Sequence, residues 1–397
     1  MNPTTVSPAA DSMADRPAWG AVLAMSLGAF VLVASEFMPV SLLTPIAADL
    51  GVTEGQAGQA ISVSGAFALL TSLCISSLAR RFDRKLLLMS LTLLMIVSGT
   101  LAAFAPNYAA FMIGRAFIGV AIGAFWSLSA ATAMRLVPIE KVPRALAILN
   151  GGNALATVVA APLGSYLGAI FGWRGAFFAL IPVAVLVLIW KTFSFPRIPA
   201  ERKASSSNVF ALLKQPAVAF GMAAVSLLFM GQFTLFTYLR PFLETVTRVD
   251  SATLSLLLLV IGVAGLIGTT LIGGLLKDSL FRTIAVIPVL MAAIALALLG
   301  FGDSLGMTAI LVALWGLVGT AAPVGWWTWL ARTLPHDAER GGGLMVAVVQ
   351  LAIAGGATVG GILFDMQGYQ ATFGASAALL VLAAVLAVLA ARAARRN

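Results

Sequence analysis

Glu36 is the one acidic residue in an apolar run that begins near Trp19 and continues to about Ile46. A carboxylate inside a membrane is costly, and such groups usually face a bundle interior or a water-filled cavity. Arg115 lies within a later apolar run. Burial disfavours the charged form of a carboxyl group, whereas a nearby guanidinium favours it. If the two side chains meet, a movement that separates them would make Glu36 exchange a proton.

The elements that position these residues are predicted to be membrane-spanning helices. The chain of 397 residues is 60% hydrophobic and 10% charged, whereas soluble domains are about half apolar and a quarter charged. A spanning helix needs roughly 20 apolar residues, and these runs do not alternate with period two as barrel strands do. The fold class is therefore predicted to be an all-α membrane protein. The twelve predicted spans lie near residues 19–43, 55–79, 86–106, 108–133, 146–169, 173–194, 216–241, 251–275, 281–302, 306–332, 341–364 and 371–393.

The distribution of Lys and Arg predicts how the spans are oriented. An even number of spans places both termini on one side of the membrane. Of the 24 basic residues, Arg174, Arg240 and Arg248 fall on the opposite side and Arg115 lies in a span, and the other 20 are on the terminus side. Loops rich in Lys and Arg stay in the cytoplasm, so both termini are predicted there, the first as a disordered tail at residues 1–17. The net charge of +9 then needs no nucleic-acid partner.

Glu36 and Arg115 are predicted to lie at the same depth. Each is about seven residues from the outer end of its span, and at 1.5 Å rise per residue both lie roughly 10 Å below the outer surface. Equal depth permits a direct ion pair. Two alternatives stay open: Arg115 braces the packing of the helices by binding backbone carbonyls, and Glu36 lies near a helix end that reaches water.

A repeat divides the chain into two halves. R-L-V-P at residues 135–138 matches R-T-L-P at 332–335, an offset of 332 − 135 = 197. G-W-R-G-A-F at 172–177 matches G-Y-Q-A-T-F at 368–373, an offset of 368 − 172 = 196. Parallel six-helix repeats around a central cavity are typical of one class of secondary transporters. The predicted division is an N-terminal bundle at 18–194, a cytoplasmic linker at 195–215 and a C-terminal bundle at 216–397.

Several motifs resemble those of the major facilitator superfamily. R-x-x-x-G at residues 115–119 occupies the fourth span, as in proton-coupled members, and A-P-L-G at 161–164 lies where antiporters carry a Gly-Pro motif. S-L-A-R-R-F-D-R-K at 77–85 is a degenerate form of the loop signature of the family, with Ser77 in place of the leading Gly. This resemblance implies gating roles for Arg81, Asp83 and Arg84.

A narrower resemblance concerns the substrate. E-F-M-P-V-S-L-L-T-P-I, G-A-F-W-S-L-S-A and G-Q-F-T-L-F-T-Y-L-R-P are similar to segments of bacterial purine ribonucleoside efflux pumps, in the drug:proton antiporter and sugar-efflux branch. The resemblance implies proton-coupled antiport of inosine, guanosine and their analogues by alternating access, in the bacterial inner membrane, by a monomer without a cofactor. Export of sugars or hydrophobic drugs is an alternative, because that branch shares E-F-x-P-V and F-W-S. A non-transporting sensor on the same fold is another.

Polar and aromatic residues within the spans are the candidates for contact with substrate. Amides can bind ribose hydroxyls or a purine edge, and tryptophan faces can stack on a base. Tryptophan also anchors helices at membrane interfaces, and Trp329 is predicted to do so. The candidate cavity residues are Trp126, Ser127, Asn150, Asn153, Gln232, Tyr238, Trp315, Trp326, Trp327 and Gln350. Asn153 and Gln350 differ by 197 and are predicted to face the cavity from opposite halves.

Small residues and a proline are predicted to shape the seams between helices. Gly119 and Gly123 form a G-x-x-x-G motif that permits close packing, as does Gly164 with Gly168. Pro162 can kink the fifth span, because its ring removes a backbone hydrogen bond.

Catalysis is not predicted. The sequence contains neither a G-x-x-x-x-G-K-[ST] phosphate loop nor a His/Cys metal cluster. Its single histidine, His336, falls in a predicted cytoplasmic loop, where no Ser-His-Asp set can form around it.

Overall fold

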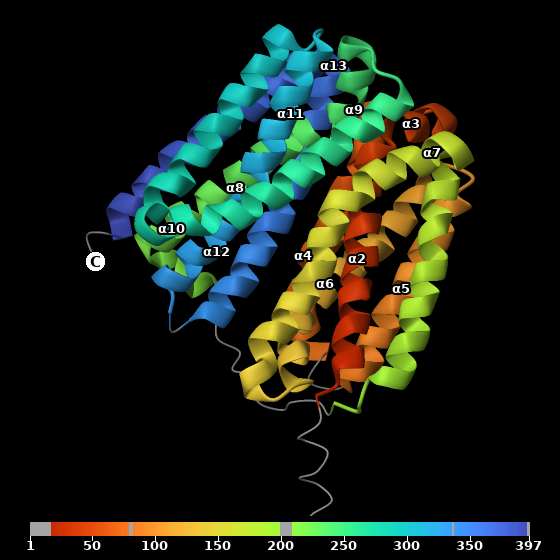
Figure 1. The fold of residues 1–397 in the computed structure, drawn as a ribbon, viewed down its shortest axis with the longest axis vertical. Coiled ribbons are helices and arrows are strands. Elements are labelled where there is room, and N and C mark those ends of the chain that lie inside the picture. The colour runs from red at the N-terminus through yellow and green to blue at the C-terminus, as the bar shows by residue number, and fades with distance from the viewer. Residues whose placement is uncertain (1–16, 79–81, 199–208, 336, 395–397) are drawn as a thin grey trace, which may run out of the picture.

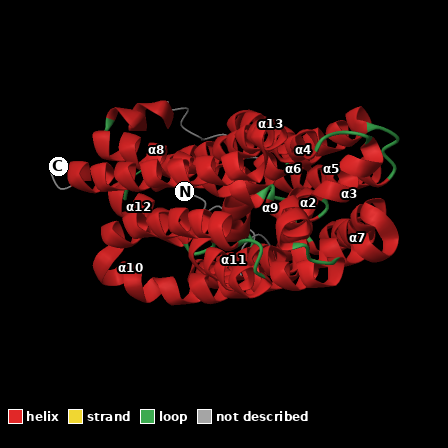
Figure 2. Ribbon diagram, turned by 90° about the horizontal axis from the view of Figure 1, so that it is seen from above, coloured by secondary structure: helices red, strands yellow, loops and turns green. Residues whose placement is uncertain are grey.

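The computed structural model describes residues 17–78, 82–198, 209–335 and 337–394. These residues form helices joined by short loops (Figure 2). The helices of the first half are α2 (Trp19–Ser41), α3 (Leu43–Leu50), α4 (Glu54–Leu78), α5 (Arg84–Ala103), α6 (Tyr108–Arg135) and α7 (Val142–Ser194). Those of the second half are α8 (Pro216–Phe236), α9 (Leu239–Phe242), α10 (Ser251–Phe301), α11 (Leu305–Gly319), α12 (Ala322–Thr333) and α13 (Ala338–Ala394).

The three longest helices each bend back on themselves. α7 breaks at Gly172, α10 at Ser279 and α13 at Gly368, where the backbone leaves the helical region. Each of them therefore supplies two membrane spans, and α11 and α12 together supply one. With α2, α4, α5, α6 and α8 this gives the twelve predicted spans. The prediction of an all-α membrane fold is confirmed.

The backbone itself carries the repeat. In the described residues, left-handed φ angles occur at Gly51 (64°), Gly172 (74°), Arg248 (59°) and Gly368 (75°). These four residues form two pairs, since 248 − 51 = 197 and 368 − 172 = 196. Gly51 and Arg248 each end a short helical segment after the first span of their half. Residues other than glycine rarely adopt this conformation, yet Arg248 does so at the position that corresponds to Gly51 in the first half.

Each half has its own apolar core. One core consists of buried residues from α2 to α7, joined by Tyr238 of the second half, and the other of residues from 212 to 387. Figure 1 shows the two bundles side by side, red to yellow-green and green to blue. Apolar side chains also cover the outer flanks, including Leu70 at 58% exposed and Leu271 at 66%. An apolar exterior around a packed interior is expected in lipid, and the chain is a multi-pass membrane protein.

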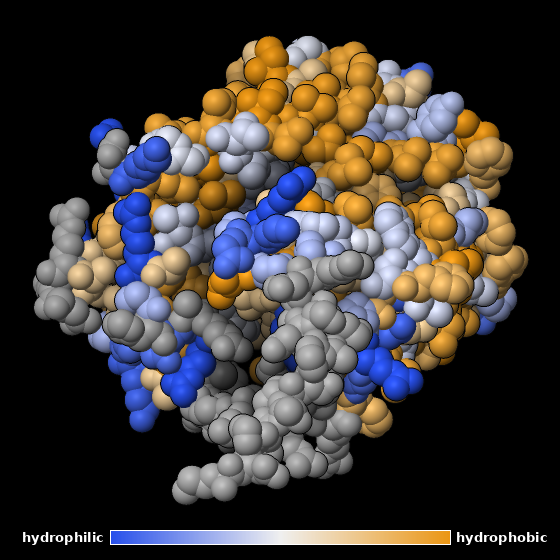
Figure 3. Space-filling model, turned by 60° about the horizontal axis from the view of Figure 1, so that its bottom comes forward, coloured by the Kyte–Doolittle hydropathy of each residue, from blue (hydrophilic) through white to orange (hydrophobic). Residues whose placement is uncertain are grey.

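The two ends of the bundles differ in polarity. We call the end that carries both termini the terminus side, and the end that carries α3 and α9 the far side. Figure 3 brings the terminus side forward and shows hydrophilic side chains gathered there, with apolar side chains on the flank above. The described parts of the predicted linker, residues 195–198 and 209–215, lie on this side. The linker also includes residues 199–208, which lie outside the described part of the chain, so its bounds stay a prediction.

The halves cross at two related seams. α4 packs on α13 at Gly65, where an added Cβ would lie 3.0 Å from the Ala354 side chain. α10 packs on α7 at Gly262, where an added Cβ would lie 2.6 Å from the Val158 carbonyl. These contacts obey the repeat, since 262 − 65 = 197 and 354 − 158 = 196. Close approach of the two halves therefore depends on a glycine in each.

Candidate functional site

Arg115 ties three helices of the first half together. Its side chain is 1% exposed. From α6, its guanidinium donates to the backbone carbonyls of Ser35 (2.7 Å) and Glu36 (2.9 Å) in α2. It also donates to the Ala60 carbonyl (3.2 Å) and the Ser64 hydroxyl (3.1 Å) in α4. These are the bonds of the bracing alternative, and a planar guanidinium with five donors can make them all at once.

Glu36 lies beside Arg115 in the far-side part of α2. It is 5% exposed and about 8 Å from the far-side end of α2 at 1.5 Å per residue. The guanidinium attracts its carboxyl group across a short distance, but within the described chain the two groups do not form a direct ion pair. The other neighbour of the carboxyl group is the Gln350 side chain of α13, in the opposite half. Glu36 therefore lies where the two halves meet.

An apolar cluster closes the far side above Glu36. Its buried residues come from α2, α4, α8 and α13, and are Val40, Ile61, Phe233, Ile353 and Ala357. Phe37, next to Glu36, stacks on Phe233 of the opposite half with ring centroids 5.6 Å apart. The cluster therefore places apolar side chains of both halves next to Glu36.

A polar contact joins the halves at the far-side end of α4. The Asp365 carboxylate of α13 accepts from the Thr53 hydroxyl (2.6 Å) and from the Gly55 amide (2.9 Å) at the start of α4. A carboxylate is stabilised at a helix N-terminus, where backbone N–H groups lack partners. Tyr238 is fully buried behind this contact, and its hydroxyl donates to the Ala357 carbonyl at 2.8 Å. We call Thr53, Gly55, Tyr238 and Asp365 the far-side latch.

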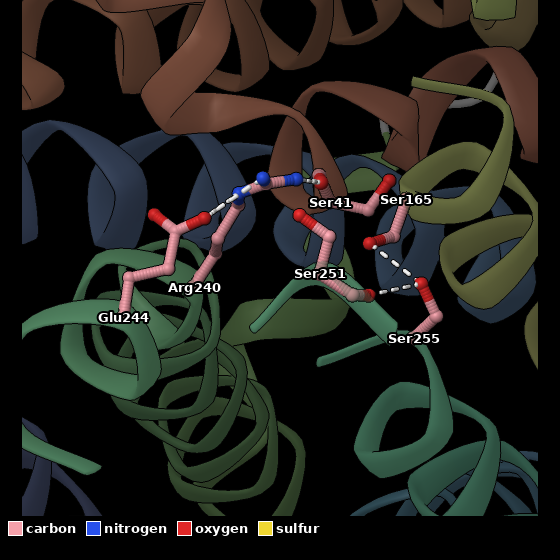
Figure 4. A network of polar contacts seen from close by, with 6 residues as sticks. All are labelled: Ser41, Ser165, Arg240, Glu244, Ser251 and Ser255. Carbon is pink, nitrogen blue, oxygen red and sulfur yellow. Dashed lines mark hydrogen bonds and ion pairs between the residues drawn. The ribbon is translucent and has the colours of Figure 1, made fainter. Parts of the chain in front are cut away.

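A second polar contact between the halves surrounds Arg240 (Figure 4). Arg240 donates to the Ser41 carbonyl at the end of α2 and pairs with Glu244 one turn away at 2.8 Å. Nearby, the Ser255 hydroxyl of α10 donates to the Ser165 hydroxyl of α7 at 2.9 Å. The side chains come from both bundles and hold the far-side ends together. The described hydrogen bonds between the halves all lie in the far-side part of their helices.

The candidate substrate residues divide by exposure. Four are buried, namely Tyr238, Trp315, Trp326 and Gln350. The others are at least partly exposed, namely Trp126, Ser127, Asn150, Asn153, Gln232 and Trp327. Gln350 faces Glu36, and Tyr238 belongs to the latch. Their contact with substrate stays a prediction.

Among the candidates, one buried hydrogen-bond acceptor and one buried donor lack a protein partner in the described chain. They are Gln232 Oε1 in α8 and Trp315 Nε1 in α11. Gln232 lies next to α11, since its Nε2 would be 3.2 Å from a Cβ added to Gly319. A buried polar group without a partner costs free energy, so these two atoms are the best placed of the set to bind a polar ligand.

The predicted role of Trp329 as an interfacial anchor is wrong. Its side chain is 0% exposed and packs edge to face on Trp326, with ring centroids 5.4 Å apart. A Cβ added to Gly221 of α8 would lie 2.0 Å from its ring. A glycine on the neighbouring helix makes room for the indole, and the sequence of α12 alone does not show this.

The predicted seam residues lie at close helix contacts. Added Cβ atoms at Gly119 and Gly123 of α6 would lie 2.3 Å and 2.1 Å from backbone oxygens of α4. One at Gly164 of α7 would lie 2.7 Å from the Ser41 hydroxyl, and Pro162 is buried within the same helix. In this conformation these glycines therefore allow neighbouring helices to pack closely.

The loop signature is only partly described. Arg81 lies outside the described residues. Asp83 caps the N-terminus of α5, accepting from the Lys85 amide at 2.7 Å. The backbone amide of Arg84 donates to the Ile198 carbonyl at 3.1 Å. The gating role of the three residues stays a prediction.

One buried cation was not identified from the sequence. Lys191 is 1% exposed in α7, donates to the Thr92 hydroxyl at 2.8 Å and lies 5.7 Å from the Phe125 ring. Its position near the end of an apolar run looks like an ordinary span boundary. Only the packing of α5 and α6 around it shows that it is enclosed.

The sequence model of the Major Facilitator Superfamily matches residues 25–357. A Pseudomonas aeruginosa protein named "Transcription regulatory protein OpdE" is 61% identical over 378 residues, which are 94% of each chain. Proteins of Salmonella paratyphi B and Salmonella typhimurium named "Purine ribonucleoside efflux pump NepI" are 41% identical over 377 residues, 95% of each chain.

Solved structures share the fold at low sequence identity. A bacterial homologue of the human lysosomal transporter Spinster, inward-facing and unoccupied, superposes with a TM-score of 0.75 at 15% identity, covering 94% of this chain and 96% of that one. A D-xylose-proton symporter superposes with a TM-score of 0.73 at 16% identity, covering 93% and 97%.

Proposed function

The chain is a member of the major facilitator superfamily, and on that premise we propose that it exports purine ribonucleosides in exchange for protons. In this proposal the termini lie in the cytoplasm of a bacterium, the far side faces outward across the inner membrane, and a monomer suffices. The observation that carries the proposal is the position of Glu36. Its buried carboxyl group lies beside Arg115, which donates to the Glu36 backbone carbonyl in the same half, and it interacts with the Gln350 side chain of the opposite half.

Alternating access couples this contact to the direction of transport. When the far-side latch opens, α13 moves away from α4, and Gln350 leaves the Glu36 carboxyl group. The Phe37–Phe233 stack parts in the same movement, so outside water reaches Glu36 and protonates it. Closure of the far side returns Glu36 to its dry site, where burial favours the neutral, protonated carboxyl group. Opening of the terminus side then admits cytoplasmic water to the site, and Glu36 releases its proton there. Each cycle thus admits a proton and lets a bound nucleoside out.

The identity of the cargo is supported by relatives and by chemistry. Two relatives at 41% identity over nearly the whole chain are named purine ribonucleoside efflux pumps. Gln232 Oε1 in α8 and Trp315 Nε1 in α11 lack protein partners in the described chain. An amide oxygen and an indole N–H can bind a donor and an acceptor of a nucleoside respectively.

A second candidate function rests on one comparison. The relative at 61% identity is named a transcription regulatory protein. In this alternative the chain senses a small molecule and changes conformation without net transport, and gene expression follows. The alternative needs a binding site and a moving latch, and it does not need Glu36 to exchange protons.

Transport by the purified full-length chain in liposomes tests the proposal. Liposomes are loaded with radiolabelled inosine and diluted into a more acidic buffer, and we expect the proton gradient to accelerate loss of inosine. Glu36→Gln should abolish this acceleration and leave exchange of inosine for inosine intact. Glu140→Gln, which changes an exposed carboxylate on the terminus side, should behave as the wild type.

Three results would contradict parts of the proposal. Unchanged acceleration in Glu36→Gln would show that the proton-coupling role is wrong. Movement of sugars or dyes without nucleosides would disprove the cargo. Tight binding of inosine without any net movement, in the wild type, would favour the sensor.

A further inference from the structure

A cavity of about 460 Å³ lies entirely within the second half, away from the seam between the bundles. The two arms of α10 form its walls, with Leu271 and Leu275 on one arm and Val286 and Leu290 on the other. Leu317 and Val318 of α11 form its floor. Its volume is in the range of ligand sites, about 300–1,000 Å³. Since no lining residue belongs to the first half, this cavity is distinct from the proposed transport path.

The cavity opens toward lipid. The four wall residues are between 43% and 66% exposed, although the floor is made of partly buried side chains. Large apolar side chains exposed in this way on a membrane protein face acyl chains. The groove is therefore filled by hydrocarbon of the bilayer or by a ligand that enters from it.

The length of the groove matches one leaflet. It runs along α10 from Gly268 to Ser279, eleven residues apart, or about 16 Å at 1.5 Å per residue. Half of a hydrocarbon core of about 30 Å is about 15 Å. Ser279 lies at the break of α10 on the terminus side, so the groove extends from the membrane surface on that side to the middle of the bilayer.

Polar groups gather at one end only. Ser279, Arg282 and Thr283 line the terminus-side end, and the two hydroxyls already donate to backbone carbonyls of α10. The Arg282 guanidinium is exposed and has no hydrogen-bond or ion-pair partner among the described residues. Arg332 reaches the same end, donating to the Leu276 carbonyl at 3.3 Å. Arg282 and Arg332 therefore place two basic side chains at this end of the groove.

We propose that this groove binds an anionic phospholipid of the leaflet on the terminus side. One acyl chain lies along Leu271, Leu275 and Val286, and the phosphate group meets Arg282 at the surface. The hydroxyl oxygens of Ser279 and Thr283 accept from the headgroup. A neutral hydrophobic substrate would leave the Arg282 guanidinium without an anionic partner. A second copy of the chain would need a wider apolar face than this one groove provides.

The lipid is tested on the full-length protein in nanodiscs of phosphatidylcholine containing a minority of phosphatidylglycerol. The probe is phosphatidylglycerol with a photoreactive group on its acyl chain, and crosslinked peptides are identified by mass spectrometry. We expect crosslinks to concentrate in residues 268–290. Arg282→Gln should reduce the crosslinks about fivefold, because one basic residue near an anionic membrane surface strengthens binding by about that factor. Val286→Trp should remove them by filling the groove, whichever headgroup is used.

A matched variant separates a site from general attraction. Arg197→Gln removes an exposed arginine on the terminus side of the first half and should leave the crosslinks unchanged. The proposal fails if Arg282→Gln and Arg197→Gln have equal effects. It also fails if photoreactive phosphatidylcholine labels 268–290 as strongly as phosphatidylglycerol does, or if the crosslinks spread evenly over all lipid-facing helices. Folding of each variant is checked by its elution as a single species.

Discussion

At the scale of single residues, Arg115 and Glu36 have different roles. The Arg115 guanidinium donates its hydrogen bonds to backbone carbonyls of α2 and α4 and to the Ser64 hydroxyl. Its charge still acts on the Glu36 carboxyl group. One residue thus fixes the geometry and the other is free to change partners. This arrangement explains why a buried cation and a buried carboxyl group can be adjacent without being bonded.

Arg115→Lys should destabilise the protein although it keeps the charge. A lysine ammonium cannot reach acceptors on two helices that a planar guanidinium bridges. Loss of two hydrogen bonds from a charged donor should lower the free energy of unfolding by about 3 kcal/mol. Thermal unfolding in detergent, followed by tryptophan fluorescence, measures the effect. Arg197→Lys, at an exposed site, should stay within about 0.5 kcal/mol of the wild type, and equal unfolding temperatures for the two variants would refute the bridging role.

At the scale of elements, the turns that reverse α7 and α13 depend on glycine. Gly172 and Gly368 combine φ angles of 74° and 75° with extended ψ angles, a region that is essentially restricted to glycine and costs other residues of order 1–3 kcal/mol. Between these turns and the next helix there is no loop to absorb a change. Two of the three breaks that turn a long helix into two spans therefore depend on a glycine, and the third is at Ser279.

Gly172→Ala and Gly374→Ala should have opposite effects on stability. The first forces alanine into this glycine-restricted region and should lower the unfolding temperature. The second lies inside a helix with no atom within 4 Å of an added Cβ, and should raise the temperature or leave it unchanged, because alanine favours helix over glycine by about 1 kcal/mol. Thermal unfolding of the two variants and the wild type measures these changes in unfolding temperature. If Gly172→Ala is as stable as Gly374→Ala, the turn is not strained.

At the scale of the whole molecule, the described polar contacts between the halves hold the far side closed. Asp365 is the central acceptor of the latch, with the Thr53 hydroxyl and the Gly55 amide as donors. The glycine seams at Gly65 and Gly262 allow the same closure. A conformation open on the far side must break both, and the free energy of the latch sets how often it does.

Asp365→Ala should shift the population toward the far-side-open conformation. Loss of a latch bond to a charged acceptor removes about 1.5–3 kcal/mol, which is a factor of about 10 or more in the equilibrium. Spin labels on Pro106 and Gly306, exposed far-side positions in the two halves, would report a longer distance for more molecules. Asp303→Ala removes an exposed far-side carboxylate and should not change the distribution. A distribution in Asp365→Ala identical to that of the wild type would rule out the latch.

Much of this architecture follows from sequence, because its causes are local. The length of each apolar run determines the number of spans, and the rise per residue predicts that Glu36 and Arg115 lie at one depth. The 197-residue offset anticipated the related turns and the fold of two bundles. These features need only hydropathy, helix geometry and repetition.

Only the tertiary structure decided which groups meet. Sequence left open whether Arg115 binds a carboxylate or backbone carbonyls, and it placed Trp329 at an interface although the indole is fully enclosed. It also did not reveal that Gln350 faces Glu36, that Asp365 caps α4, or that Lys191 is buried. The physical reason is the same in each case. The direction in which a side chain leaves its helix, and the helix it meets there, are set by packing between segments more than a hundred residues apart.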